Sequence, residues 1–145
     1  MLSYFPEVFV QRALATHLYS RGYQVREEVL FGSSRFDIIA LTGTRVVGYE
    51  VKMGSWSRAM NQADIYQLCC DEVYLVIPSV RLNASIEDRC VARGLGLITI
   101  GPPPDWQFAQ ILAAPQSQRK NSLHNASIRS IAAFKGKRSS LIFYG

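Results

Sequence analysis

The spacing of apolar residues predicts one helix and three strands in the first third of the chain. Val10, Leu14 and Leu18 recur at helical spacing within residues 7–20, and Gly22 ends this helix. Three segments of largely alternating or continuously apolar character then predict strands at 23–31, 35–42 and 45–53. The linkers between these strands are short and carry glycine, as expected of tight turns.

The remaining pattern alternates between helices and buried strands. Ser55 or Ser57 is a suitable N-cap for a helix that ends near residue 70. The apolar run VYLVI at 73–77 predicts a buried strand, residues 84–92 a helix, and residues 95–100 a strand that stops at a Gly-Pro-Pro-Pro sequence. The order αβββαβαβ predicts an α/β fold in which helices cover both faces of a mixed sheet.

The two-residue linker Gly43-Thr44 predicts a type II′ turn, and this turn sets the register of its hairpin. Residue 42 then pairs with 45, residue 39 with 48, and Asp37 with Glu50. The face expected to enter the core carries Phe36, Ile38, Ala40, Val47, Tyr49 and Val51. The open end of the other face carries Arg35, Asp37, Glu50 and Lys52, and Gly48 beside them leaves room for another group to approach.

Two directly opposed carboxylates repel each other, and three arrangements relieve that repulsion. One carboxyl keeps its proton, a cationic side chain lies between them, or a metal ion binds. Lys52 and Arg35 are close enough in sequence to make a plain salt-bridge cluster at the sheet end. The spacing alone leaves the salt-bridge cluster and the functional site as open alternatives.

Charge divides the chain at about residue 114. Residues 1–114 contain all eleven acids and ten basic residues, which predicts a near-neutral core domain, whereas residues 115–145 form a basic extension without acids. Such an extension indicates a polyanionic partner, a protein-docking segment or simply a solubilising end. In it we expect a helix at 122–134, a basic turn at 135–138 and a strand at 141–144. The candidate nucleic-acid-binding residues are Arg35, Arg58, Arg119, Lys120, Arg129, Lys135, Lys137 and Arg138.

Other features predict a cytoplasmic protein. No apolar run is long enough to span a bilayer, and the first residues lack the pattern of a secretory signal. Cys69, Cys70 and Cys90 show neither metal-ligand nor disulfide spacing, which predicts reduced and buried thiols. We therefore expect no membrane partner.

The order of the motif residues resembles the PD-(D/E)xK nuclease superfamily, and most nearly its small archaeal Holliday-junction-resolvase-like members. The resemblance covers residues 7–100 and rests on Asp37, the tripeptide Glu50-Val51-Lys52, and the flanking helices with Glu7 and Gln62. Tyr66 follows one turn after Gln62. Phe36 stands where the motif name has proline, a position that varies in the superfamily.

The resemblance implies a restriction-endonuclease-like αβββαβ core and a Mg²⁺- or Mn²⁺-dependent endonuclease acting on DNA, including branched or damaged DNA, without a small-molecule cofactor. Asp37, Glu50 and the Val51 carbonyl would hold the metal, and Lys52 would activate water. Glu7 and Gln62 would assist, although Glu7 also suits a helix N-terminus and Gln62 an ordinary surface position. By analogy with the same superfamily, we also expect a homodimer. The alternative is a non-catalytic nucleic-acid-binding or assembly module on the same fold.

Overall fold

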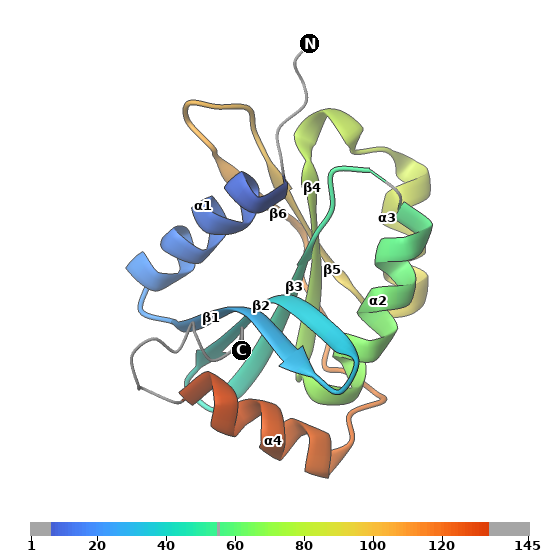
Figure 1. Cartoon of the computed structure of the whole chain (residues 1–145). Coiled ribbons are helices and arrows are strands. Elements are labelled where there is room, and N and C mark those ends of the chain that lie inside the picture. The colour runs from blue at the N-terminus through green and yellow to red at the C-terminus, as the bar shows by residue number, and fades with distance from the viewer. Residues whose placement is uncertain (1–6, 55, 134–145) are drawn as a thin grey trace.

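The computed structural model describes residues 7–54 and 56–133 of the chain (Figure 1). Its helices are α1 (Glu7–Ser20), α2 (Trp56–Cys69), α3 (Ala84–Arg93) and α4 (Ser122–Ala133), with a short 3₁₀ turn at Ser79–Arg81. Its strands are β1 (Gln24–Phe31), β2 (Ser34–Thr42), β3 (Arg45–Val51), β4 (Glu72–Pro78), β5 (Gly96–Ile100) and β6 (Phe108–Leu112). The predicted α/β class is confirmed.

The six strands form one mixed sheet in sequence order from β1 to β6. The first three strands are antiparallel hairpins, β3, β4 and β5 are parallel, and β6 returns antiparallel to β5. The parallel pairs are connected by α2 and α3, as expected because a parallel crossover needs a long connection. The carboxyl ends of β3 and β4 therefore point in the same direction.

Helices cover both faces of the sheet (Figure 1). On one face α1 buries Val10, Leu14 and Leu18 against Ile38 and Tyr49. On the other face α2, α3 and α4 enclose a second apolar cluster, in which Tyr66 of α2 is fully buried. Cys69, Cys70 and Cys90 are free and buried in this cluster, as predicted. None of the described helices is long and apolar enough to cross a membrane.

The predicted helices and strands that fall on the described residues are present, and their ends lie within one or two residues of the expected positions. The exception is β6, which was not predicted; its five residues have an irregular burial pattern and follow a proline-rich loop. Only pairing with the edge of β5 defines this segment as a strand. The predicted strand at 141–144 and basic turn at 135–138 lie outside the described residues.

The predicted hairpin register is confirmed from Thr42↔Arg45 to Ile38↔Tyr49, where the ladder ends. One expectation about the faces is wrong. Phe36 packs in the α2 cluster, whereas Ile38 packs under α1, so the alternation of faces breaks at Asp37. The neighbouring strand shows the matching irregularity, because Glu28 has a positive φ of 53° and pairs with no residue of β2.

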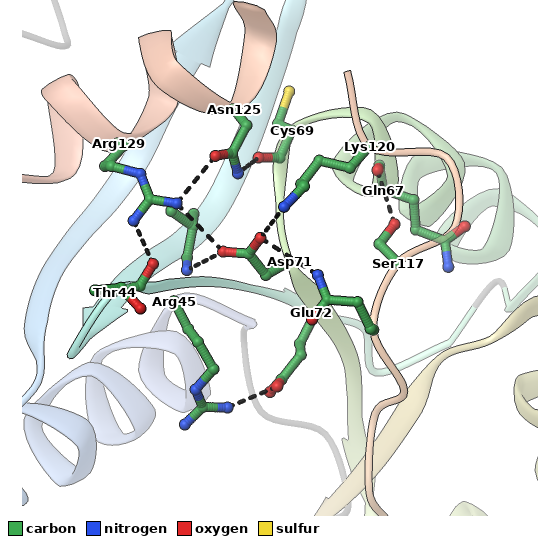
Figure 2. A network of polar contacts seen from close by, with 12 residues as sticks. Thr44, Arg45, Gln67, Cys69, Asp71, Glu72, Ser117, Lys120, Asn125 and Arg129 are labelled. Carbon is green, nitrogen blue, oxygen red and sulfur yellow. Dashed lines mark hydrogen bonds and ion pairs between the residues drawn. The ribbon is translucent and has the colours of Figure 1, made fainter. Parts of the chain in front are cut away.

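The basic segment after β6 is tied to the sheet through Asp71, the buried residue that precedes β4 (Figure 2). Its carboxylate accepts hydrogen bonds from Val46 N at 2.7 Å and from Lys120 Nζ at 2.6 Å, and Arg129 lies 3.5 Å away. Arg129 also donates to the carbonyl of Thr44 in the hairpin turn. Burial raises the pKa of Asp71, but these hydrogen bonds and cations outweigh it and lower the pKa below its usual value.

Candidate active site

The candidate site lies where β2 and β3 separate beyond the Ile38–Tyr49 pair. Asp37 takes part in neither neighbouring ladder. Its backbone N–H instead donates to the Tyr66 hydroxyl at 2.7 Å, and its Oδ2 accepts a hydrogen bond from Val51 N at 2.8 Å. The carboxylate of Asp37 therefore occupies the place beside β3 that a backbone carbonyl would take in a continued ladder.

Glu50 brings a second carboxyl to the same place. Its residue is only 6% exposed, and its Oε1 lies 2.7 Å from the Tyr66 hydroxyl. The same hydroxyl is 3.1 Å from the carbonyl of Tyr49. Because a phenol has a single proton, the shorter contact makes Glu50 its main acceptor.

Tyr66 reaches this position because residue 48 is glycine. A Cβ on Gly48 would collide with the Tyr66 ring and would lie 2.9 Å from Cys70 Sγ. The room that the sequence predicted beside Glu50 is thus filled by the Tyr66 ring. Tyr66 was expected in the core, and this is confirmed, but its hydroxyl also connects both carboxylate-bearing strands.

The two carboxyls perturb each other. Burial and the charge of Asp37 raise the pKa of Glu50 to about 8, and burial, followed by the charge of Glu7, raises the pKa of Asp37 to about 6. A hydrogen bond between the side chains favours the proton on Glu50. At neutral pH the pair therefore holds about one proton on Glu50, beside an ionised Asp37. The predicted pairing of Asp37 with Glu50 across the two strands does not form, but their carboxyls still interact with each other beyond the end of the ladder.

Lys52 and Glu7 lie at the edge of this pair. Lys52 directly follows β3, and its N–H donates a hydrogen bond to the Val76 carbonyl. Its side chain is 18% exposed. Its Nζ is 3.9 Å from Glu7 Oε1, while Glu7 Oε2 accepts a hydrogen bond from Met53 N at 3.0 Å. Glu7 thus attaches the first turn of α1 to the segment that follows Lys52.

Gln62 makes no hydrogen bond to the carboxyl pair. Its Nε2 donates to the backbone carbonyl of Arg35 at 3.1 Å, one residue before Phe36. Gln62 therefore fixes the start of β2 against α2. Its predicted catalytic role stays a prediction.

The predicted nucleic-acid-binding residues fall into three groups. Arg58 is exposed and forms no ion pair with any residue of the described ranges. Arg35, Arg119, Lys120 and Arg129 are engaged with Glu28, Asp64 and Asp71. Lys135, Lys137 and Arg138 lie outside the described residues. Arg58 is thus the one with a fully available charge among the predicted residues that the structure describes.

The donor atoms at this site suit a hard divalent cation. In 7–54 and 56–133 no three His, Cys, Asp or Glu residues form a metal-binding cluster, so the protein would supply two carboxylates. Magnesium is commonly held in this way, because it keeps several waters and needs few protein ligands. A cation between Asp37 and Glu50 would also remove the repulsion that raises both pKa values. The residues present therefore fit Mg²⁺ or Mn²⁺.

Comparisons with known proteins support the fold and go no further. No protein-family model matches the chain, and no curated protein matches its sequence. Its structure is similar to SPO1766, a protein of unknown function from Silicibacter pomeroyi, with a TM-score of 0.63 and 18% identity over 89% of this chain and 84% of that one. A more distant similarity, with a TM-score of 0.40 and 12% identity, is to SfsA of Pyrococcus furiosus in complex with Ca²⁺, over 75% of this chain and 61% of that one. The first similarity shows a shared α/β fold.

Proposed function

We propose that this chain is a metal-dependent DNA endonuclease with its reaction centre at Asp37, Glu50 and Lys52. The observation that carries the proposal is the contact between a half-buried carboxyl, Asp37, and a buried one, Glu50, at the point where β2 and β3 separate. Lys52 lies two residues after Glu50. A purely structural ion-pair cluster would place the cation between the acids. Here no ion pair joins Asp37 or Glu50 to a cation among the described residues, and Lys52, whose charge lowers the pKa of both carboxyls, is paired with Glu7 at 3.9 Å.

Asp37 and Glu50 would hold Mg²⁺ or Mn²⁺, together with the backbone carbonyl of Val51. The bound ion supplies neutralisation of the phosphate charge and a more acidic water. The Val51 N–H fixes Asp37 Oδ2, and the Tyr66 hydroxyl fixes Glu50 Oε1, so both carboxyls are oriented before any ligand arrives. Such preorganisation lowers the cost of binding a cation.

Lys52 would orient or deprotonate the attacking water, or stabilise the charge that develops on the phosphate. Its ammonium is held at the edge of the site by the neighbouring carboxylate of Glu7. Glu7 in turn accepts the Met53 N–H, which fixes the chain directly after Lys52. In this arrangement Glu7 positions Lys52, and its first-turn location also favours the α1 dipole.

The substrate is proposed to be DNA because the chain carries a net charge of +5 with a basic C-terminal segment. Arg58 lies in the first turns of α2 and has its charge available for a phosphate. Such contacts recognise the backbone and not the base sequence. A homodimer is a further proposal, which gel filtration with light scattering tests.

The test is cleavage of supercoiled, linear, branched and single-stranded DNA with Mg²⁺, Mn²⁺ or EDTA. The wild type should cleave at least one substrate only with a divalent ion, and Asp37→Asn and Lys52→Ala should lose at least about 100-fold in rate. Asp88→Asn, on the exposed face of α3, is the matched control and should cleave normally. Metal-independent DNA binding without cleavage of any substrate would instead identify a non-catalytic nucleic-acid-binding module.

A further inference from the structure

A cavity of about 480 Å³ lies on the α1 face of the sheet, between the last turns of α1 and β6. It is lined by Leu14 and His17 of α1, by Arg21 directly after α1, and by residues of β3, β4, β5 and β6. Glu7 lies at the opposite end of α1, so this cavity is separate from the carboxyl pair. Its volume is in the usual range for small-molecule sites.

Four aromatic side chains, Tyr49, Tyr74, His17 and Phe108, are among the residues that line it. Tyr49 and Tyr74 stack with ring centroids 5.5 Å apart and planes inclined by 12°. His17 of α1 contacts Phe108 of β6, with ring centroids 5.0 Å apart. Tyr49 and Tyr74 are buried and stacked on each other, so they offer only their edges to the cavity, whereas the half-buried His17 and Phe108 are the rings that a flat ligand can reach.

Two polar groups in the cavity have unused hydrogen-bonding capacity. No hydrogen bond of the Tyr49 hydroxyl is found in the described part of the chain, and its oxygen is not among the fully buried polar atoms, so it opens into the cavity that Tyr49 lines. Burial raises its pKa, so the hydroxyl stays protonated and can donate. Gln110 accepts the Tyr74 hydroxyl through Oε1 at 3.1 Å, which leaves its amide NH₂ as a further donor.

The charges at the cavity favour an anionic ligand. Arg45 is neutralised by Glu72 at 2.6 Å. Arg21 is exposed and forms no ion pair with a residue that the structure describes. Burial and the charge of Arg21 lower the pKa of His17, which is therefore neutral at pH 7 and able to accept or donate one hydrogen bond. The uncompensated charge is thus the guanidinium of Arg21.

We infer that this cavity binds a nucleoside monophosphate, with the base among the aromatic rings and the phosphate at Arg21. A nucleobase is flat and carries the edge acceptors that Tyr49 and Gln110 require, and a phosphate is the anion that a guanidinium binds best. Two ligands present a base and a phosphate in this way: a free nucleotide and the 5′-phosphorylated end of a nucleic-acid strand. The inference does not depend on catalysis at Asp37 and Glu50.

NMR titration and calorimetry of the full chain with AMP, UMP, adenosine and inorganic phosphate test this inference. We expect saturable binding of a nucleotide that shifts the ring signals of Tyr49, His17 and Phe108, and weaker binding of adenosine or phosphate alone. Arg21→Ala should weaken nucleotide binding about 10-fold and Tyr49→Phe about 5-fold, as expected for a charged and a neutral hydrogen bond. Arg89→Ala on α3 is the control for charge and should bind as the wild type does.

A 5′-phosphorylated dinucleotide distinguishes the two sources. Tighter binding than AMP would identify a strand end, and weaker binding would identify a free nucleotide. Asp37→Asn should retain the nucleotide site, which separates this inference from the proposed nuclease. The inference is overturned if no nucleotide shifts the cavity signals, or if Arg21→Ala binds as tightly as Arg89→Ala.

Discussion

The hydroxyl of Tyr66 lies 2.7 Å from Oε1 of Glu50 and accepts the backbone N–H of Asp37 at the same distance. One buried phenol thus replaces the backbone hydrogen bonds that end where β2 and β3 separate, and it orients one carboxyl of the pair. The proposed site depends on this contact. Tyr66→Phe is therefore the first substitution to consider.

Tyr66→Phe should lower the free energy of unfolding by about 1–3 kcal/mol, because it leaves the Asp37 N–H without its partner. It should also raise the pKa of Glu50 further, since the lost hydrogen bond lowers that pKa in the wild type. The pH profile of cleavage should then move to higher pH. Tyr74→Phe removes another buried hydroxyl that is hydrogen-bonded at Gln110, and it should cost stability without that pH shift.

Gly48→Ala should destabilise the protein by about 1–3 kcal/mol, because the added methyl group collides with the Tyr66 ring in a filled core. Displacement of the ring would also disturb Glu50 and reduce cleavage. Gly54→Ala is the matched control, since a Cβ there has no neighbour within 4 Å. Denaturant unfolding of the two variants measures the difference, and equal stability would contradict the packing of Tyr66 on Gly48.

Without divalent ions, the stability of the wild type should fall as the pH rises from about 4 to 8. Asp37 and Glu50 have pKa values raised in the folded state, so the folded protein binds more protons than the unfolded chain across this window. Each extra proton contributes a slope of about 1.4 kcal/mol per pH unit. Asp37→Asn combined with Glu50→Gln should flatten the curve, and a wild-type curve equally flat would contradict the buried pair. Mg²⁺ should restore stability at high pH.

Asp71→Asn should destabilise the protein by about 1.5–3 kcal/mol, because it weakens the charged hydrogen bonds that this buried carboxylate accepts from the partly exposed Lys120 and Arg129. Hydrogen exchange should show faster opening of α4, which these cations tie to the hairpin turn and β4 (Figure 2). Asp88→Asn on the surface of α3 provides the comparison. Unchanged protection of α4 would show that its apolar contacts through Ile128 suffice.

Arg58→Ala should weaken DNA binding and reduce its salt dependence by about one counterion. Arg129→Ala should act first on stability, because Arg129 is hydrogen-bonded to Asn125 and Thr44 within the protein. Fluorescence anisotropy at several salt concentrations measures both variants. If both variants reduced the salt dependence equally, Arg129 would have to exchange its internal hydrogen bonds for contacts with DNA.

The helices, the first five strands and the hairpin register could be predicted from local sequence, because each follows from residue spacing or from a two-residue turn. The orientation of Phe36 could not be predicted from alternation. The break at Asp37 coincides with a positive φ at Glu28, a residue type that gives no such signal in sequence. The strand β6 was likewise invisible, since pairing with β5 alone defines it.

The carboxyl pair could be predicted from the turn, but its surroundings could not. Tyr66 is recognisable as a core residue from its helical position, whereas the partners of its hydroxyl depend on how α2 packs on β2 and β3. Lys120 and Arg129 appear in sequence as free charges of a basic segment. Their partner Asp71 lies 49 and 58 residues away, so only the fold brings them together.

The most direct test of the central claim is calorimetric titration of the full chain with Mn²⁺ at pH 7, in two buffers of different ionisation enthalpy. If Asp37 and Glu50 form a metal site, the wild type should bind one or two ions and release about one proton, because the cation displaces the proton held by Glu50. Asp37→Asn should lose both the binding and the proton release, while Asp88→Asn keeps them. No Mn²⁺ binding by the wild type, or equal binding by Asp37→Asn, would contradict the claim.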